Sequence, residues 1–167
     1  MKAISLWQPW ASAIACGAKR IETRSWPTNH RGPILIHAAK RYVWEEAVTV
    51  QCSWTWCGAL RPLGLKMGGD KELRELLPFG AIVATANLVD CRPTASFSVG
   101  EIEEVRKPEG EGLDLYYWTE RLMGDFTVGR FGLVLENVVP LTSPIPFSGK
   151  QGLFDVPASL IEGATTS

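Results

Sequence analysis

The residues of this chain that are best suited to chemistry lie in one short run near its N-terminus. Lys19 is followed by Arg20, Glu22 and Arg24 at alternating positions. Alternating side chains of an extended strand point to one face, so the last three would form a charge ladder. Paired guanidinium groups hold phosphate through forked hydrogen bonds, and they keep a carboxylate between them ionised. The run predicts either an anion-binding site or an ordinary solvated ion-pair ladder, which is common on protein surfaces.

Three tryptophans flank this charged run. Trp7 and Trp10 precede it, with Gln8 between them, and Trp26 follows it. A nucleic-acid base that stacks on such a ring gains about 1–3 kcal/mol. Large aromatic side chains are more often packing residues, so we expect Trp7 and Trp10 to wedge the first helix onto the core. Trp26 lies beside a proline in a loop and is the better candidate for a stacking surface.

The next strand and the loop before it carry further candidates. His37 lies within an apolar strand, where we favour a core histidine with satisfied hydrogen bonds. The alternative places it on the floor of a cleft near Lys40, as a phosphate donor or a general acid/base. His30 and Arg31 are expected to contact backbone phosphates, and Gly32 allows a ligand to approach the backbone closely.

The formal net charge of −1 hides an uneven distribution. The first 41 positions hold seven basic residues and one acidic residue, whereas the rest hold ten basic and seventeen acidic residues. Such segregation creates a local positive field that attracts anions. The alternative is that the two halves neutralise each other in the fold.

Other site chemistries lack a signal. There is no P-loop, dinucleotide fingerprint, HExxH or GxSxG motif. The four cysteines and two histidines show no zinc-ligand spacing, so we expect reduced thiols, no metal and no cofactor. No apolar run approaches the roughly 18–20 residues of a membrane span, and the N-terminus lacks a signal peptide. These features lead us to expect a cytoplasmic protein with no membrane partner.

Short elements separated by glycine and proline turns must position these residues. At 167 residues, with 46% hydrophobic and 21% charged side chains, the chain suits one globular domain. Short strands with a few helices predict an α+β fold, a small β-barrel with helices on its rim. We expect strands at 1–6, 20–26, 33–38, 80–89, 131–135, 137–141 and 152–156, and helices at 9–16, 40–50 and 70–77. The domain is expected over 1–157, with insertions at 51–75 and 92–120 and a flexible tail at 158–167.

Two stretches near the N-terminus, ISLWQPWASAIACGAKRIETRSW and RGPILIHAAKR, resemble the opening of the ASCH domain, a branch of the PUA-like superfamily. Its signature G-x-K-x-x-E-x-R is met by Gly17, Lys19, Glu22 and Arg24. Later stretches, GDFTVGRFGLVLENVVPL and GKQGLFDVP, resemble the closing strands of bacterial and phage-type members. The resemblance covers both ends of the chain but not 51–75 or 92–120.

The resemblance implies a PUA-like barrel with a cleft beside the first helix, lined by the signature, and an RNA-related role. Some members of the family are amidohydrolases on acylated cytidine that use a lysine, a threonine and a glutamate; others are ribonucleases or accessory domains of transcription coactivators. Lys19 matches the lysine, and Glu101 is the candidate for the glutamate. Glu22 occupies the threonine position, with Thr23 shifted by one onto the opposite strand face. This departure counts against the amidohydrolase activity.

We therefore expect a domain that binds RNA, another single-stranded nucleic acid or a modified nucleotide in a basic cleft beside the first helix. The residues expected to bind it are Gln8, Lys19, Arg20, Thr23, Arg24, Ser25, Trp26, Arg31, Gly32, His37 and Lys40. The alternative is a hydrolase, either N4-acetylcytidine amidohydrolase-like or a metal-independent ribonuclease, with Lys19 as the reactive residue and Glu22 or Glu101 as its partner. A third possibility is a protein-binding domain with an apolar patch of Trp54, Trp56 and residues 116–118.

Overall fold

The fold is built on one six-stranded, strongly curved half-barrel sheet with the strand order β2-β5-β4-β3-β1-β6. The computed structural model describes residues 1–42, 53–65, 70–107 and 116–161, so the helix expected at 40–50 lies largely outside the described residues. Strands β1 and β3 are parallel, and the other neighbouring pairs are antiparallel. The strands are β1 (Lys2–Leu6), β2 (Ile21–Arg24), β3 (Gly32–Ala38), β4 (Ala81–Pro93), β5 (Phe131–Pro146) and β6 (Leu153–Asp155).

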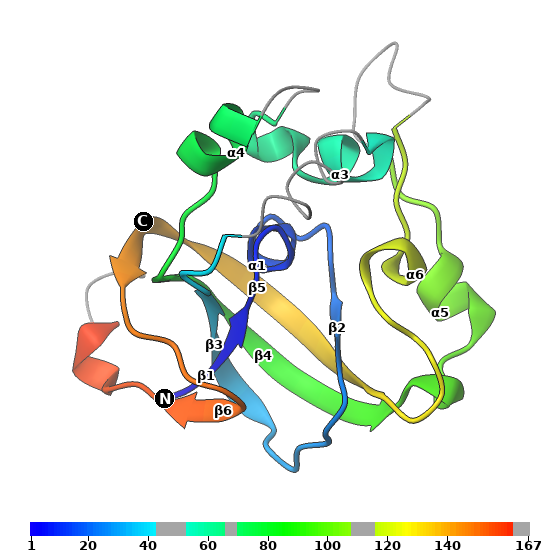
Figure 1. Cartoon of the computed structure of the whole chain (residues 1–167). Coiled ribbons are helices and arrows are strands. Elements are labelled where there is room, and N and C mark those ends of the chain that lie inside the picture. The colour runs from blue at the N-terminus through cyan, green and yellow to red at the C-terminus, as the bar shows by residue number, and fades with distance from the viewer. Residues whose placement is uncertain (43–52, 66–69, 108–115, 162–167) are drawn as a thin grey trace.

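Helices surround this sheet, as expected for an α+β fold. In the view of Figure 1, α3 and α4 lie above α1, and α5 and α6 lie to the right of β2. The helices are α1 (Trp10–Ala15), α3 (Trp54–Ala59), α4 (Asp70–Leu76), α5 (Val99–Glu103) and α6 (Glu120–Met123). None of the described helices is long and apolar enough to span a bilayer.

The two longest strands, β4 and β5, give the sheet its curvature. The separate strands expected at 131–135 and 137–141 are one continuous strand, which is a correction to the sequence analysis. Register shifts along the β4–β5 pair mark bulges, and Asn137, with φ of 50°, lies at one of them. An extra residue in one strand bends the ladder and increases its twist. The alternation of side chains is therefore interrupted at the bulge, although the strand itself continues.

Helix α1 joins two hydrophobic clusters. Ala11 and Ile14 pack against the sheet, next to Ile36 and Leu133 among others. On the other side, Ala13 packs in a second cluster that includes residues from α3 and α4. The expected insertion at 51–75 therefore builds, in its described part, a second core over α1.

The expected apolar patch does not form as a single exposed surface. Trp56 and Trp118 are buried in the cluster over α1. Trp54 remains half-exposed and packs edge-on against Tyr116, with ring centroids 5.1 Å apart.

The described C-terminal residues continue to pack beyond 157. Ala158–Leu160 form a 3-10 turn, and Ile161 is buried beside Phe154. Residues 162–167 of the expected tail lie outside the described residues.

Candidate functional site

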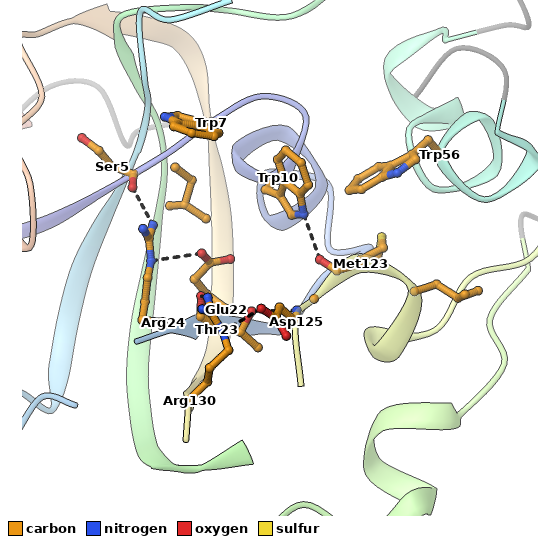
Figure 2. A pocket seen from close by; sticks show the side chains of 13 residues that line it. Ser5, Trp7, Trp10, Glu22, Thr23, Arg24, Trp56, Met123, Asp125 and Arg130 are labelled. Atoms are coloured by element: carbon orange, nitrogen blue, oxygen red, sulfur yellow. Dashed lines mark hydrogen bonds and ion pairs between the residues drawn. The ribbon is translucent and has the colours of Figure 1, made fainter. Parts of the chain in front are cut away.

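A cavity of about 490 Å³ opens beside α1, where β2 faces the chain that follows α6. Figure 2 shows Glu22 and Arg24 pointing toward each other below Trp7, with Trp10 and Met123 across from them. The cavity is lined by Ser5, Leu6, Trp7, Trp10, Glu22, Thr23, Arg24, Trp56, Leu122, Met123, Gly124, Asp125 and Arg130. Three indole rings and two carboxylate–guanidinium ion pairs thus share one concave surface.

Strand β2, which carries Glu22 and Arg24 of the signature, lies at an edge of the sheet. An edge strand has one row of backbone groups without strand partners, and buried N–H groups need acceptors. The buried carboxylate of Glu120 accepts hydrogen bonds from the backbone N–H of Arg20 at 2.7 Å and of Ile21 at 3.1 Å. It also accepts one from Arg106 Nη2 at 2.9 Å. Glu120 therefore fixes the start of β2, a role that sequence reasoning missed because its partners lie about a hundred residues away.

Lys19 lies behind the residues that line the cavity. The side chain is fully buried, and its Nζ donates a hydrogen bond to the carbonyl oxygen of Ile21. The same Nζ lies 3.7 Å from Glu22 Oε2. A Cβ added at Gly124 would lie 3.3 Å from this Nζ, so Gly124 covers the amino group closely. Lys19 is thus adjacent to the lining residues Glu22 and Gly124 without lining the cavity.

Glu22 and Arg24 form the first acid–base pair of the cavity. Arg24 Nε lies 3.1 Å from Glu22 Oε1, and Arg24 Nη2 donates to the backbone oxygen of Ser5 at 2.6 Å. The buried Nε has no aligned hydrogen-bond acceptor in the described part of the chain. Glu22 therefore lies between Arg24 and Lys19, whereas the sequence placed it between Arg24 and Arg20.

Asp125 and Arg130 form the second pair, across β2 from the first. Thr23 Oγ1 accepts a hydrogen bond from the backbone N–H of Asp125 at 3.0 Å, which holds this segment against β2. Arg130 Nε lies 3.2 Å from Asp125 Oδ2. Hydrogen bonds from the Thr127 hydroxyl and backbone N–H, with the nearby Arg130 charge, lower the pKa of Asp125. Neither Asp125 nor Arg130 was predicted, although both lie within the recognised stretch GDFTVGRF.

The tryptophans exchange the roles expected from the sequence. Trp7 follows β1 and is 42% exposed at the cavity, with the guanidinium of Arg41 4.3 Å above its ring. Trp26 is instead half-buried against the main core. Trp10 lines the cavity, donates from Nε1 to Met123 O at 2.9 Å, and packs edge-on against Trp56. The expected core role fits Trp10 but not Trp7.

Several predicted cations do not line the cavity. Arg20 pairs with Glu104 at 2.6 Å and lies 3.7 Å from Glu120. Arg31 lies 3.3 Å from Asp90. Acids from later elements thus neutralise these two groups, as the second interpretation of the charge distribution proposed.

The remaining candidates lie at other positions. Gln8 is buried, donates to Pro78 O, and accepts from the backbone N–H of Ser12, so it ties the first turn of α1 to Pro78. Ser25 is exposed after β2, and Gly32, with φ of 106°, begins β3.

Glu101 is separated from the lysine and glutamate of the predicted catalytic set. It caps α5 through Ser98 and pairs with Arg92. Hydrogen bonds from Ser98 and Arg92 lower the pKa of this exposed carboxyl to about 2. The structure therefore brings Lys19, Glu22, Thr23 and Arg24 together but leaves Glu101 outside their group.

His37 and Lys40 line a second hollow instead of this cavity. The His37 ring is buried, with Nδ1 2.9 Å from Ser5 Oγ and Nε2 2.9 Å from Phe147 O. Both ring nitrogens have partners, as the favoured core interpretation requires.

One family model, two curated relatives and a solved structure are similar to this chain. The family model described as "ASCH domain" matches residues 4–127. "Activating signal cointegrator 1" of Homo sapiens and its Mus musculus counterpart are each 35% identical to this chain over 95 residues. The match spans 56% of this chain but only 15% of the length of either relative. The crystal structure of ASCH from Zymomonas mobilis superposes over 96% of this chain and 90% of that chain, with a TM-score of 0.50 at 16% identity, which supports the fold.

Proposed function

This chain belongs to the ASCH domain family, and from that premise we propose that it binds single-stranded RNA by enclosing one unpaired base in the cavity beside α1. The observation that carries the proposal is the convergence of three indole rings with the Glu22–Arg24 and Asp125–Arg130 pairs around about 490 Å³. Small-molecule sites combine apolar walls with a few placed polar groups. An unpaired RNA base needs a stacking surface and partners for its hydrogen-bonding edge.

The polar groups of the cavity suit such an edge. Glu22 offers acceptors to an exocyclic amine, and the Arg24 guanidinium beside it offers donors. Two carboxylates and two guanidinium groups leave the lining without formal net charge. A neutral base therefore enters without an uncompensated charge, and recognition depends on hydrogen bonds and stacking rather than on bulk attraction.

We expect a pocket for one base rather than the basic cleft that the sequence analysis predicted. Of the predicted cations, Arg24 alone lines the cavity in the described part of the chain. Lys19 acts on the ligand through Glu22, because its amino group is buried 3.7 Å from that carboxylate.

The test is a binding titration with short single-stranded RNA and DNA at two salt concentrations, in which tryptophan fluorescence reports binding. Trp7→Ala removes the exposed ring, and the loss of about 1–3 kcal/mol of stacking weakens binding by about 5- to 150-fold. Arg121→Gln is the matched control, because Arg121 is exposed and pairs with Glu103 outside the cavity. Absence of RNA binding by the wild type at low salt, or equal binding by Trp7→Ala, refutes the proposal.

A second candidate function is hydrolysis of an amide on a modified nucleoside, or of RNA, with Lys19 as the reactive residue. The contact of Lys19 with Glu22, beside Thr23, favours it, because a nearby carboxylate can exchange a proton with the amine. Incubation of the wild type and Lys19→Ala with N4-acetylcytidine and with RNA tests it. Equal product from the two proteins eliminates this mechanism, whereas product from the wild type alone supports it.

A further inference from the structure

A second hollow adjoins the base pocket and differs from it in charge. It is a groove of about 1040 Å³ between the end of β3 and the chain that links β5 to β6. Ser5 lines both hollows, so they meet at that residue. The groove is lined by Ser5, His37, Ala39, Lys40, Phe79, Gly80, Pro146, Phe147, Ser148, Gly149, Lys150 and Gln151.

The groove has a positive lining without acids. Lys40 and Lys150 are its charged residues, whereas the base pocket holds two acids and two bases. Both lysines are exposed, and neither forms an ion pair with an acid in the described part of the chain. Lys150 does contribute, after Lys2, to the lowered pKa of Asp155. Two exposed ammonium groups in a concave surface attract an anion, because the lining itself offers none.

Contacts beneath the groove fix the linking chain. His37 Nε2 lies 2.9 Å from the Phe147 carbonyl, which can only accept, so Nε2 carries the hydrogen. Nδ1 of the same ring lies 2.9 Å from the Ser5 hydroxyl oxygen. The buried histidine thereby ties the end of β5 to β1 and β3. Its structural role is to position the loop.

Glycine is required where the loop crosses these two residues. A Cβ at Gly149 would lie 2.3 Å from Ser5 Oγ and 2.4 Å from His37 Cε1. The backbone at Gly149 is thus held against β1 and β3. No hydrogen bond within the described structure occupies the N–H groups of Gly149, Lys150 and Gln151. Backbone N–H groups that have no acceptor within the protein are available to donate to a bound anion.

The two hollows are also linked along the chain. Trp7 lines the base pocket, and Arg41 stacks on its exposed ring. The preceding residue, Lys40, lines the groove. An RNA strand with one base stacked near Trp7 would therefore have Arg41 and Lys40 beside it, on the side towards the groove.

We propose that the groove lined by Lys40, Lys150 and the loop at 147–151 is a phosphate-binding subsite, which takes the phosphate adjoining a base held in the neighbouring pocket. Ammonium groups bind phosphate as point charges, and the loop N–H groups supply directional donors. The placement of the base rests on the proposed function, whereas the binding of phosphate in the groove does not. It assigns base recognition to the neutral pocket and anion recognition to the positive groove.

The experiment compares the four ribonucleosides with their 3′- and 5′-monophosphates, by isothermal titration at low salt. We expect at least one monophosphate to bind about tenfold or more tightly than its nucleoside. Lys40→Gln/Lys150→Gln removes this preference and leaves nucleoside affinity unchanged. Arg121→Gln, which removes an exposed cation outside both hollows, retains the preference. Equal affinities for nucleosides and monophosphates in the wild type, or a preference that survives the double substitution, overturn the proposal.

A separate arm uses inorganic phosphate and the backbone resonances of Gly149 and Lys150. We expect a saturable shift of both resonances that the double variant loses, and a shift of neither overturns the subsite. Failure of every nucleoside, monophosphate and RNA to bind refutes the base pocket, and the phosphate arm then decides the subsite on its own. The two proposals therefore fail by different results.

Discussion

Replacing Glu120 with alanine tests the account of how the edge strand is held. The substitution removes the acceptor of the Arg20 and Ile21 backbone N–H groups and the partner of Arg106. The Arg106 side chain is only 18% exposed, so its guanidinium loses a partner in a largely buried setting. Breaking a buried, hydrogen-bonded charge pair costs about 3–5 kcal/mol. That is a large part of the about 5–15 kcal/mol by which most domains are stable.

For a chain of this size, each kcal/mol shifts the melting temperature by about 2–4 °C, so we expect Glu120→Ala to lower it by about 6–20 °C. Thermal unfolding followed by circular dichroism measures the shift. Hydrogen exchange gives a local readout, because the Ile21 amide should lose protection first. Glu120→Gln retains one acceptor oxygen, and its melting temperature should fall between those of the other two proteins.

Glu103→Ala is the matched control. Glu103 is also a carboxylate paired with an arginine, at 2.7 Å from Arg121, but it is 47% exposed. Exposed substitutions of this kind change stability by about 0.5 kcal/mol or less. If Glu120→Ala melts within about 2 °C of the wild type, or if Glu103→Ala is equally destabilised, burial is not what makes Glu120 important and the reasoning is wrong.

Three further outcomes follow from single contacts. Ser98 and Arg92 lower the pKa of Glu101 in the folded protein to about 2. Between about pH 4.5 and pH 2 the unfolded chain therefore binds more protons than the folded one, and the free energy of unfolding decreases as the pH falls. In acid unfolding titrations Glu101→Gln should reduce the slope of stability against pH in this range, and an unchanged slope contradicts the contact. Ile14→Ala opens a cavity at a fully buried site and should cost about 2–5 kcal/mol in urea unfolding, whereas a loss under 1 kcal/mol would place Ile14 outside the core. Asn137→Val puts a β-branched residue at φ of 50° and should cost about 1–2 kcal/mol by the same assay, with Asn137→Gly near neutral as its control.

Much of the fold follows from local patterns. Alternation predicted β2, the apolar run PILIHA predicted β3, and the helix expected at 9–16 is α1 (Trp10–Ala15), which Gly17 follows with φ of 78°. These features depend on residues within a few positions of one another, where the period of the backbone fixes which side chains share a face. The break within β5 was wrong, because a bulge changes the side-chain pattern without ending the strand.

The candidate site was only partly predictable. The signature supplied Glu22 and Arg24, which line the cavity together with Thr23. Asp125 and Arg130 join them because hydrogen bonds across more than a hundred positions hold their segment against β2. No spacing along the chain reports such a contact.

What the sequence determined by itself was most of the strands, the first helix, the family and the presence of cations near the N-terminus. What the tertiary structure decided was which of these cations can meet a ligand. Arg20 and Arg31 carry the same charge as Lys40, but Glu104 and Asp90 are brought to them from positions 84 and 59 residues away. Ion pairing acts over a few ångströms of space rather than along the chain, so only the folded arrangement distinguishes a neutralised charge from an available one.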